Sequence, residues 1–287
     1  ETALQSKKEL SNLVSIIIPA IIISTIYFGF YLEIAHYFQT LFQESEVTIN
    51  QYEHYNNYDL LKFKTIWLLI YSMVFAAALS VANMKLIKNK TLGHINIGLN
   101  GLVVFVFLTS GLYMLSELRE NYLDVNPSQY YEIGAFHIII RYISFMFLAV
   151  ILFMTYKYIQ ETFMTFTKKI LFSILFHITM VWVLSSELIN VMDLSGSIQS
   201  HKLGLSIFWG LYALYLIALG IWKKKKYLRI AAIALFSITL IKLFFYDISH
   251  LGTLSKTIVF VSLGILLLII SFLYNKFKTS ISDDVED

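Results

Sequence analysis

The chain has 287 residues, of which 57% are apolar and only 14% are charged, whereas soluble domains carry about 25% charged residues. This composition excludes a soluble globular protein. The absence of cysteine and the low counts of proline and glycine exclude disulfide-rich and collagen-like scaffolds. A net charge of +3 gives no reason to expect a nucleic-acid partner, and we predict neither a metal nor a cofactor.

Long apolar runs dominate the chain between its polar ends. Each run is long enough to cross a hydrocarbon core of about 30 Å as a helix. The runs are continuous, unlike the alternating strands of about ten residues in a membrane barrel. The sequence therefore predicts an all-α, polytopic integral membrane protein with about eight transmembrane helices. The predicted spans are 12–32, 64–84, 93–116, 135–157, 169–190, 203–222, 227–246 and 256–275.

The basic residues give these spans a direction. Fifteen of the 22 Lys and Arg residues fall in one set of connections, including Lys7-Lys8 and the run Lys223–Lys226. By the positive-inside rule this set is cytoplasmic, so both termini are predicted inside, in a bacterial inner membrane. Twelve of the 19 acids then lie outside. The longest outer connection, about 33–63, suits an interfacial or re-entrant cap.

The eight spans form four in–out–in hairpins, which we predict to be weak internal repeats within one transmembrane domain. The hairpins cover 12–84, 93–157, 169–222 and 227–275. At the outer end of each outgoing helix stands an acid followed by Leu or Ile. These acids are Glu33, Glu117, Glu187 and Asp247.

These four acids admit two interpretations. A helix C-terminus disfavours a carboxylate, so each acid would need a partner, either a cation on the next helix or a ligand. The alternative is that acids gather outside simply because Lys and Arg are kept inside. His201 and Lys202, near the outer start of a returning helix, are candidate partners in the third hairpin.

Ionisable groups inside spans are candidates for function because burying them in lipid is costly. Lys242 precedes Asp247 by five residues, so it either pairs with Asp247 or binds an anion. The alternative is a lysine that snorkels to the outer headgroups. His137 and Arg141 are four residues apart and share a helix face. They could bind an anionic headgroup, or form an interhelical ion pair with Glu117 or Glu187.

Other polar residues favour structural roles. We predict that His177 is a neutral packing residue bonded to a neighbouring helix, and that Asn96 and Asn100 bond across helices. Arg229 is predicted to anchor the cytoplasmic interface by contacting anionic lipid. The sequence contains no His-Glu-x-x-His, Walker A or Gly-x-Ser-x-Gly pattern.

The C-terminal part resembles a known family. It contains GLYALYLIALG at 210–220, IKLFFYD at 241–247 and VSLGILLLIISFLY at 261–274, and YLEIAHY at 31–37 is a further element. These strings resemble the C-terminal block of bacterial predicted membrane proteins of domain of unknown function 2339. The resemblance implies that the chain is the C-terminal part of a longer polytopic protein, and it implies no reaction. The family's recurrent polar pattern matches Ser206, Trp209, Arg229, Lys242 and Asp247.

Three functions fit these observations. The first is transport, or handling of a lipid or envelope substrate, through an outward-facing polar cavity. Its ligand groups would be drawn from Glu33, Glu117, His137, Arg141, Glu187, His201, Lys202, Lys242 and Asp247. The second is a membrane-embedded enzyme acting on a lipid-linked substrate. The third is a structural or assembly subunit of a membrane complex. Membrane lipids, a lipid-linked or small polar substrate and the remainder of a larger protein are the expected partners.

Overall fold

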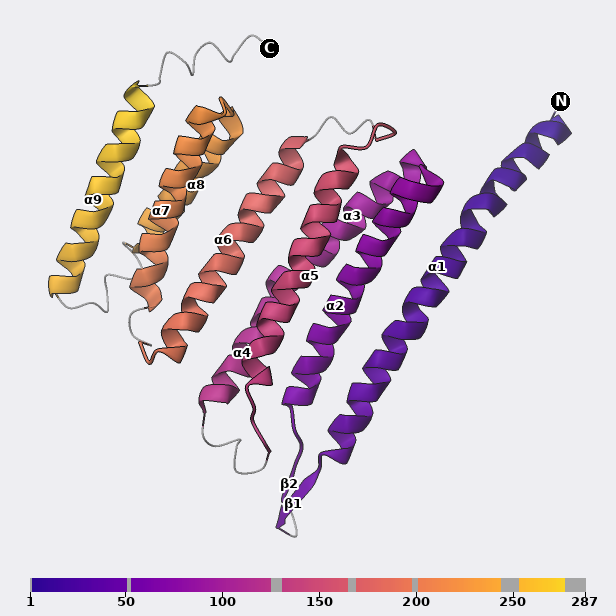
Figure 1. Ribbon diagram of the computed structural model, residues 1–287, viewed down its shortest axis with the longest axis horizontal. Helices are drawn as coiled ribbons and strands as arrows, with labels where there is room; N and C mark the ends of the chain where they lie inside the picture. Colours follow the sequence, from indigo (N-terminus) through magenta and orange to yellow (C-terminus); the bar gives the residue numbers. More distant parts are fainter. Residues whose placement is uncertain are drawn as a thin grey trace. The chain divides into compact units, whose positions relative to one another are not determined.

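The computed structural model describes residues 2–50, 53–124, 131–164, 169–197, 201–243 and 253–276, and almost all of them are helical (Figure 1). The helices are α1 (Thr2–Glu44), α2 (Asp59–Ala82), α3 (Lys90–Val106), α4 (Leu112–Leu123), α5 (Phe136–Ile159), α6 (Lys169–Leu194), α7 (His201–Trp222), α8 (Lys226–Lys242) and α9 (Thr253–Lys276). A π-helical turn over Phe107–Gly111 joins α3 to α4, and a second, Asn83–Ile87, follows α2.

Over the described residues each predicted span lies on a helix, because continuous apolar runs leave the helix as the conformation that satisfies the backbone in lipid. Six helices of the described residues are long and apolar enough to cross a membrane: Ile17–Glu44, Asp59–Ile87, Lys90–Leu123, Phe136–Ile159, Ile170–Leu194 and Gly204–Trp222. The chain is therefore a multi-pass, all-α membrane protein. A count of eight spans and the orientation of the termini stay predictions.

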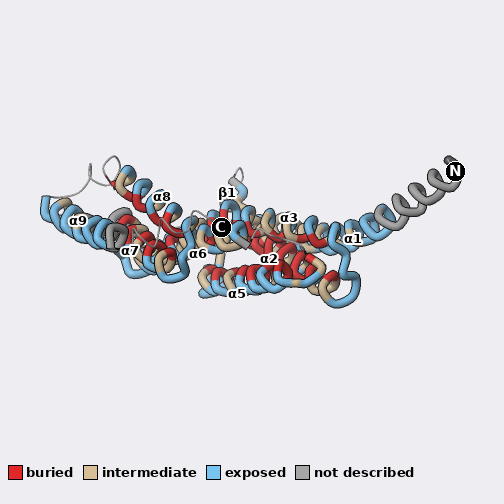
Figure 2. The backbone as a smooth tube through the Cα atoms, turned by 90° about the horizontal axis from the view of Figure 1, so that it is seen from above, coloured by how far each residue is buried: buried red, intermediate tan, exposed pale blue. Residues whose placement is uncertain are grey.

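The chain divides into two compact units, residues 1–166 and 167–287. In the first unit, α2 is the central helix and packs against α1, α3, α4 and α5. Buried residues run along α2, whereas α1 is largely exposed (Figure 2). The middle of this unit is apolar, and its most deeply buried side chains include Ile66, Met73, Phe107 and Ile151.

In the second unit, α7 packs against α6, α8 and α9. Tyr212, Leu216 and Ile217 of α7 form a buried core with Leu228 and Ala232 of α8. Arg229 is also buried, only 4% exposed, and its side chain packs against Gly220 of α7. The prediction that Arg229 anchors the chain to anionic lipid is therefore wrong, because a neighbouring helix covers this side chain.

The first predicted outer connection is much shorter than the sequence suggested. Helix α1 continues to Glu44, and a small antiparallel hairpin follows, with β1 (Val47–Asn50) paired to β2 (Glu53–Tyr55). The helix continues because apolar residues recur at helical spacing beyond position 33, as Ile34, Phe38 and Leu41 do, and these side chains are partly buried.

Three of the four predicted acids do not stand at helix ends. Helix α1 ends eleven residues after Glu33, α4 ends six residues after Glu117, and α6 ends seven residues after Glu187. The macrodipole acts mainly within the last turn. The dipole argument for a partner therefore does not apply to these three acids, and Asp247 lies outside the described residues.

Candidate functional site

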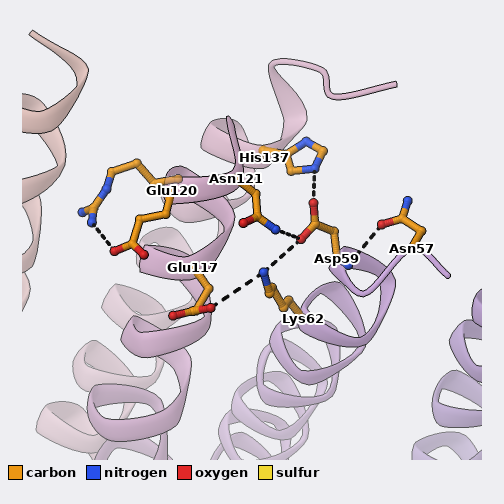
Figure 3. Close-up of polar contacts among 8 residues, drawn as sticks. Asn57, Asp59, Lys62, Glu117, Glu120, Asn121 and His137 are labelled. Atoms are coloured by element: carbon orange, nitrogen blue, oxygen red, sulfur yellow. Dashed lines mark hydrogen bonds and ion pairs between the residues drawn. The ribbon is translucent and has the colours of Figure 1, made fainter. Parts of the chain in front are cut away.

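A polar cluster forms where α2 begins, α4 ends and α5 begins, and Asp59 is its centre (Figure 3). We call Asn57, Asp59, Lys62, Glu117, Asn121 and His137 the Asp59 cluster. The residues converge because α2, α4 and α5 pack side by side with these three ends together. A carboxylate in the first turn of α2 is also favoured by the helix macrodipole.

Asp59 is only 5% exposed and is contacted by three donors. The Asn121 Nδ2 group donates to Oδ1 at 2.6 Å, and Lys62 Nζ lies 3.1 Å from the same oxygen. His137 Nε2 lies 3.2 Å from Oδ2. The Asp59 amide N–H in turn donates to Asn57 Oδ1, which fixes the start of the helix. These donors compensate for the burial of the charge.

The two ring nitrogens of His137 both face acceptors. Nδ1 lies 3.0 Å from the Gly134 carbonyl oxygen, which can only accept, so Nδ1 carries a proton. The contact of Nε2 with the Asp59 carboxylate then requires one further proton between them. Because Lys62 and Asn121 also donate to Asp59, the network assigns an ionised carboxylate and an imidazolium.

Lys62 links Asp59 to a second acid. Its Nζ lies 3.8 Å from Glu117 Oε2, and the Lys62 side chain is only 16% exposed. The predicted partnership of Glu117 with a cation is therefore found, but the cation comes from α2 and not from the following helix. On the next turn of α4, Arg119 pairs with Glu120 at 3.3 Å.

A cap of tyrosines and the β-hairpin covers the cluster. The Tyr131 hydroxyl lies 2.9 Å from the Ser45 carbonyl oxygen and 2.6 Å from that of Tyr55, so its proton points at both acceptors. Its ring also stacks on Tyr55. Burial raises the pKa of Tyr131 above its ordinary value of 10.0, so the phenol remains a donor at neutral pH.

A small pocket lies between the cap and the cluster. Its volume is about 30 Å³, which leaves room for water and not for a lipid headgroup. The residues that line it are Tyr55, Asn57, Tyr58, Asp59, Asn121, Tyr131, Glu132, Ile133 and His137. A larger ligand could reach Asp59 only if the cap moved.

Two of the four candidate residues predicted in the first unit belong to the cluster. Glu117 and His137 lie in it, and Arg141 lies one turn below His137 on the same buried face of α5. Arg141 is 1% exposed, with its guanidinium 5.3 Å from the Phe145 ring centroid. Glu33 is exposed on α1 and forms no hydrogen bond or ion pair within the described part of the chain.

The sequence predicted that His137 or Arg141 would pair with Glu117 or Glu187. At His137 a different pair forms. The acid facing His137 is Asp59. Both ring nitrogens of His137 are directed at Asp59 and Gly134, and anion binding by His137 stays a prediction.

In the second unit, Lys242 Nζ donates to Ser206 Oγ at 3.0 Å and lies 5.9 Å from the Trp209 ring centroid. The Trp209 indole N–H donates to Ser185 Oγ at 2.8 Å, which links α8, α7 and α6. Glu187, also on α6, faces Asn190 at 3.4 Å. The predicted pairing of Lys242 with Asp247 involves a residue outside the described part.

Two further predicted residues, His201 and Lys202, are the first two residues of α7, and their side chains are outside the described part. The prediction for His177 is confirmed, because Nδ1 lies 3.0 Å from the Tyr212 hydroxyl on α7. The prediction for Asn100 is also confirmed, since it donates to Ser80 and Thr155 on neighbouring helices.

Sequence reasoning missed Asp59, Asn121 and Tyr131. One local signal was present: Asp59 precedes Lys62 by three residues at the start of an apolar run, which places both on one face of a first turn. Asn121 and Tyr131 carried no comparable signal, because their partners lie more than 60 residues away. Among the described residues, no group of three or more His, Asp or Glu could hold a metal ion.

Comparisons with known proteins agree with this architecture. No curated protein and no solved structure matches the chain. The family described as "Predicted membrane protein (DUF2339)" matches residues 2–277, far beyond the strings that carried the resemblance in the sequence. The chain therefore belongs to this family of predicted membrane proteins, domain of unknown function 2339.

Proposed function

We propose that this chain is a multi-pass protein of the bacterial inner membrane, with both termini inside, that transports or handles a polar or lipid-linked substrate from the outer side. The Asp59 cluster would be the binding site of the first unit. The observation that carries the proposal is the buried Asp59 carboxylate, held by donors from α2, α4 and α5 beneath a small pocket. Groups of this kind within the membrane commonly mark substrate and ion pathways.

The charges around the pocket favour a cationic group as the ligand. With Glu132, the cluster holds three carboxylates against the ammonium of Lys62 and the imidazolium of His137. Three tyrosine rings, Tyr55, Tyr58 and Tyr131, complete the wall, and aromatic faces attract cations. A small monovalent cation, or the amine of a larger molecule, would suit these groups better than a phosphate.

The cap sets a condition on binding. A pocket of about 30 Å³ admits water, so any larger group requires the Tyr131 segment to separate from the hairpin. The described contacts of this link include the Tyr131 hydroxyl and its stacked ring, and contacts of these kinds contribute only about 1 kcal/mol each. In this proposal, opening of the cap is the step that admits the substrate.

The enzyme alternative is weaker at this site. A general base needs a nitrogen with a free lone pair, and both His137 nitrogens are occupied by hydrogen bonds. In the second unit, Ser185 donates to the Val181 carbonyl and accepts from Trp209, which leaves its hydroxyl proton engaged. Catalysis would therefore have to use other residues, such as His201 or His250.

The structural alternative has one specific observation in its favour: Asp59, Lys62 and His137 already satisfy one another. A cluster that only locks three helices together would bind nothing. Thermal unfolding in detergent separates the two functions when sodium, potassium, ammonium and tetramethylammonium chlorides are compared at equal ionic strength. Binding predicts that one cation raises the Tm of the wild type and leaves that of Asp59→Asn unchanged.

The matched control is Glu33→Gln, because Glu33 is an exposed acid of the same unit outside the cluster. This variant should respond to the cation as the wild type does. If all four cations shift the Tm of the wild type and of Asp59→Asn equally, the binding proposal is wrong and the structural alternative is preferred.

A further inference from the structure

A second buried polar group lies at the other end of the first unit, in the half where α3 begins and α2 and α5 end. Ser80, Asn100 and Thr155 are each at most 3% exposed. The Asn100 Nδ2 group donates to Ser80 Oγ at 3.1 Å and to Thr155 Oγ1 at 2.9 Å. One side chain of α3 thus joins α2 and α5 within the membrane-spanning region.

Three polar atoms of this region are buried without a hydrogen-bond partner among the described residues. They are Oδ1 and Nδ2 of Asn96 and Oδ1 of Asn100. Asn96 is 1% exposed, and the two asparagines are four residues apart, so they share one face of α3. Buried amides in native proteins are nearly always satisfied, either by protein groups or by ordered water.

The three unsatisfied atoms indicate what kind of ligand could bind to them. Two are acceptors and one is a donor. The described side chains that bond to one another here, those of Ser80, Asn83, Asn100, Thr155 and Tyr158, are uncharged. A cation could bind the oxygens and would be repelled by the Asn96 N–H group. A molecule that both donates and accepts would satisfy all three.

We infer that Asn96 and Asn100 bind water in the core of the first unit. Tyr158 lies one turn after Thr155 on the buried face of α5, and its hydroxyl accepts from the Asn83 side chain, which leaves its own proton available to such a water. A bound water with two to four polar partners is a regular component of a protein interior. The site goes beyond the proposed function, because it shares no residue with the Asp59 cluster.

An apolar layer separates this site from the Asp59 cluster. On the buried face of α5, Leu148 and Ile151 lie between Ser144 and Thr155. From α3 and the π-helical turn that follows it, Val104 and Phe107 are at most 1% exposed. The first unit therefore has a charged polar group at one end, a neutral hydrated one towards the other, and a dry layer between them.

Hydroxyl-radical footprinting of the wild type tests the inference, because radicals formed from bound water oxidise adjacent buried rings. Tyr158 and Phe107 are matched probes, since both are aromatic and fully buried. Bound water predicts that Tyr158 is oxidised several-fold faster than Phe107. Equal rates for the two rings would overturn the inference.

The variant Asn96→Leu provides a second test, because leucine has the same branching as asparagine, although it is larger, and cannot bind water. If water satisfies the Asn96 amide, the variant should lose several degrees of Tm and the oxidation of Tyr158 should fall. If the amide is truly unsatisfied, removing it should raise the Tm. A raised or unchanged Tm would therefore overturn the inference. Val104→Leu, on the same helix in the dry layer, controls for a change of side chain at a buried site of α3.

Discussion

His137 on α5 is hydrogen-bonded to Asp59 on α2. Its Nε2 lies 3.2 Å from Asp59 Oδ2, and its Nδ1 lies 3.0 Å from the Gly134 carbonyl oxygen. This geometry makes the ring a double donor, and so makes Asp59 and His137 an ion pair buried at the junction of two membrane helices. The pair explains why a charged side chain is tolerated at 5% exposure.

The first prediction concerns His137 as a donor. Replacement by leucine leaves Asp59 with one donor fewer and should lower the free energy of unfolding by about 2 kcal/mol. His137→Gln keeps an N–H group at a similar reach and should lose less than half as much. Urea unfolding of the detergent-solubilised protein measures both. Equal losses for the two variants would show that the hydrogen bond to Asp59 contributes nothing.

Tyr131→Phe should release the cap. The variant loses the hydroxyl that bonds to Ser45 and Tyr55 and keeps the stacked ring, so overall stability should fall by only about 1 kcal/mol. Hydrogen exchange over residues 45–58 should nevertheless become faster. Unchanged exchange in this segment would contradict a capping role.

The same hydroxyl predicts a pH dependence. Because burial raises the pKa of Tyr131, the neutral phenol stabilises the cap fully below pH 10.0, and this contribution is lost as the pH rises through the raised pKa. Exchange over 45–58 should therefore be constant from neutral pH to about pH 9, after correction for intrinsic exchange, and should rise as the pH passes through the raised pKa of Tyr131. Tyr131→Phe should show no such rise.

Gly93 permits a close approach of α3 to the end of α5. A Cβ at this position would overlap Met164 Sδ and would lie 3.4 Å from the Tyr158 hydroxyl. Because the overlapping atoms are the far end of a flexible methionine side chain that can shift, Gly93→Ala should destabilise the protein by no more than about 1 kcal/mol through overpacking. Gly98→Ala, on the same helix with nothing within 4 Å, should instead stabilise it by up to about 1 kcal/mol.

A second substitution, Met164→Ala, tests whether the Met164 side chain is what opposes a Cβ at position 93. If the methionine side chain is the obstacle, the double variant Gly93→Ala, Met164→Ala should recover part of the stability lost in Gly93→Ala alone. No recovery would mean that the glycine is needed for another reason.

The orientation of the chain can be tested directly because it contains no cysteine. Single cysteines at Glu132 and Lys224, both exposed, would report the two sides of the membrane. In intact cells with a permeabilised outer membrane, an impermeant maleimide should label Glu132→Cys and should label Lys224→Cys only after lysis. The reverse pattern would overturn the predicted orientation.

The helices were predictable from the sequence because each is a continuous apolar run, and lipid leaves no other conformation for such a run. The end of α1 was not predictable in this way, because residues 33–44 mix polar and apolar side chains. Only their packing shows that they remain helical. Because the hairpins appear to repeat in the sequence, Glu33 and Glu117 were predicted to have the same role. The structure places Glu33 on an exposed face and Glu117 beside Lys62.

The centre of the candidate site could not be predicted for a related reason. Asp59 gains its importance from Asn121 and His137, which lie 62 and 78 residues further along the chain. Such contacts depend on which helix ends meet, and hydrophobic patterns do not specify this. His137 and Glu117 were predicted because an ionisable group near a membrane span is conspicuous in itself.

The central claim is that the Asp59 cluster binds a substrate cation, and cation uptake into proteoliposomes tests it most directly. The cation chosen is the one that raises the Tm of the wild type. The account predicts uptake by the wild type and by Glu33→Gln, and its loss in Asp59→Asn while the purified variant remains folded. Uptake by Asp59→Asn at the rate of the wild type would contradict the account.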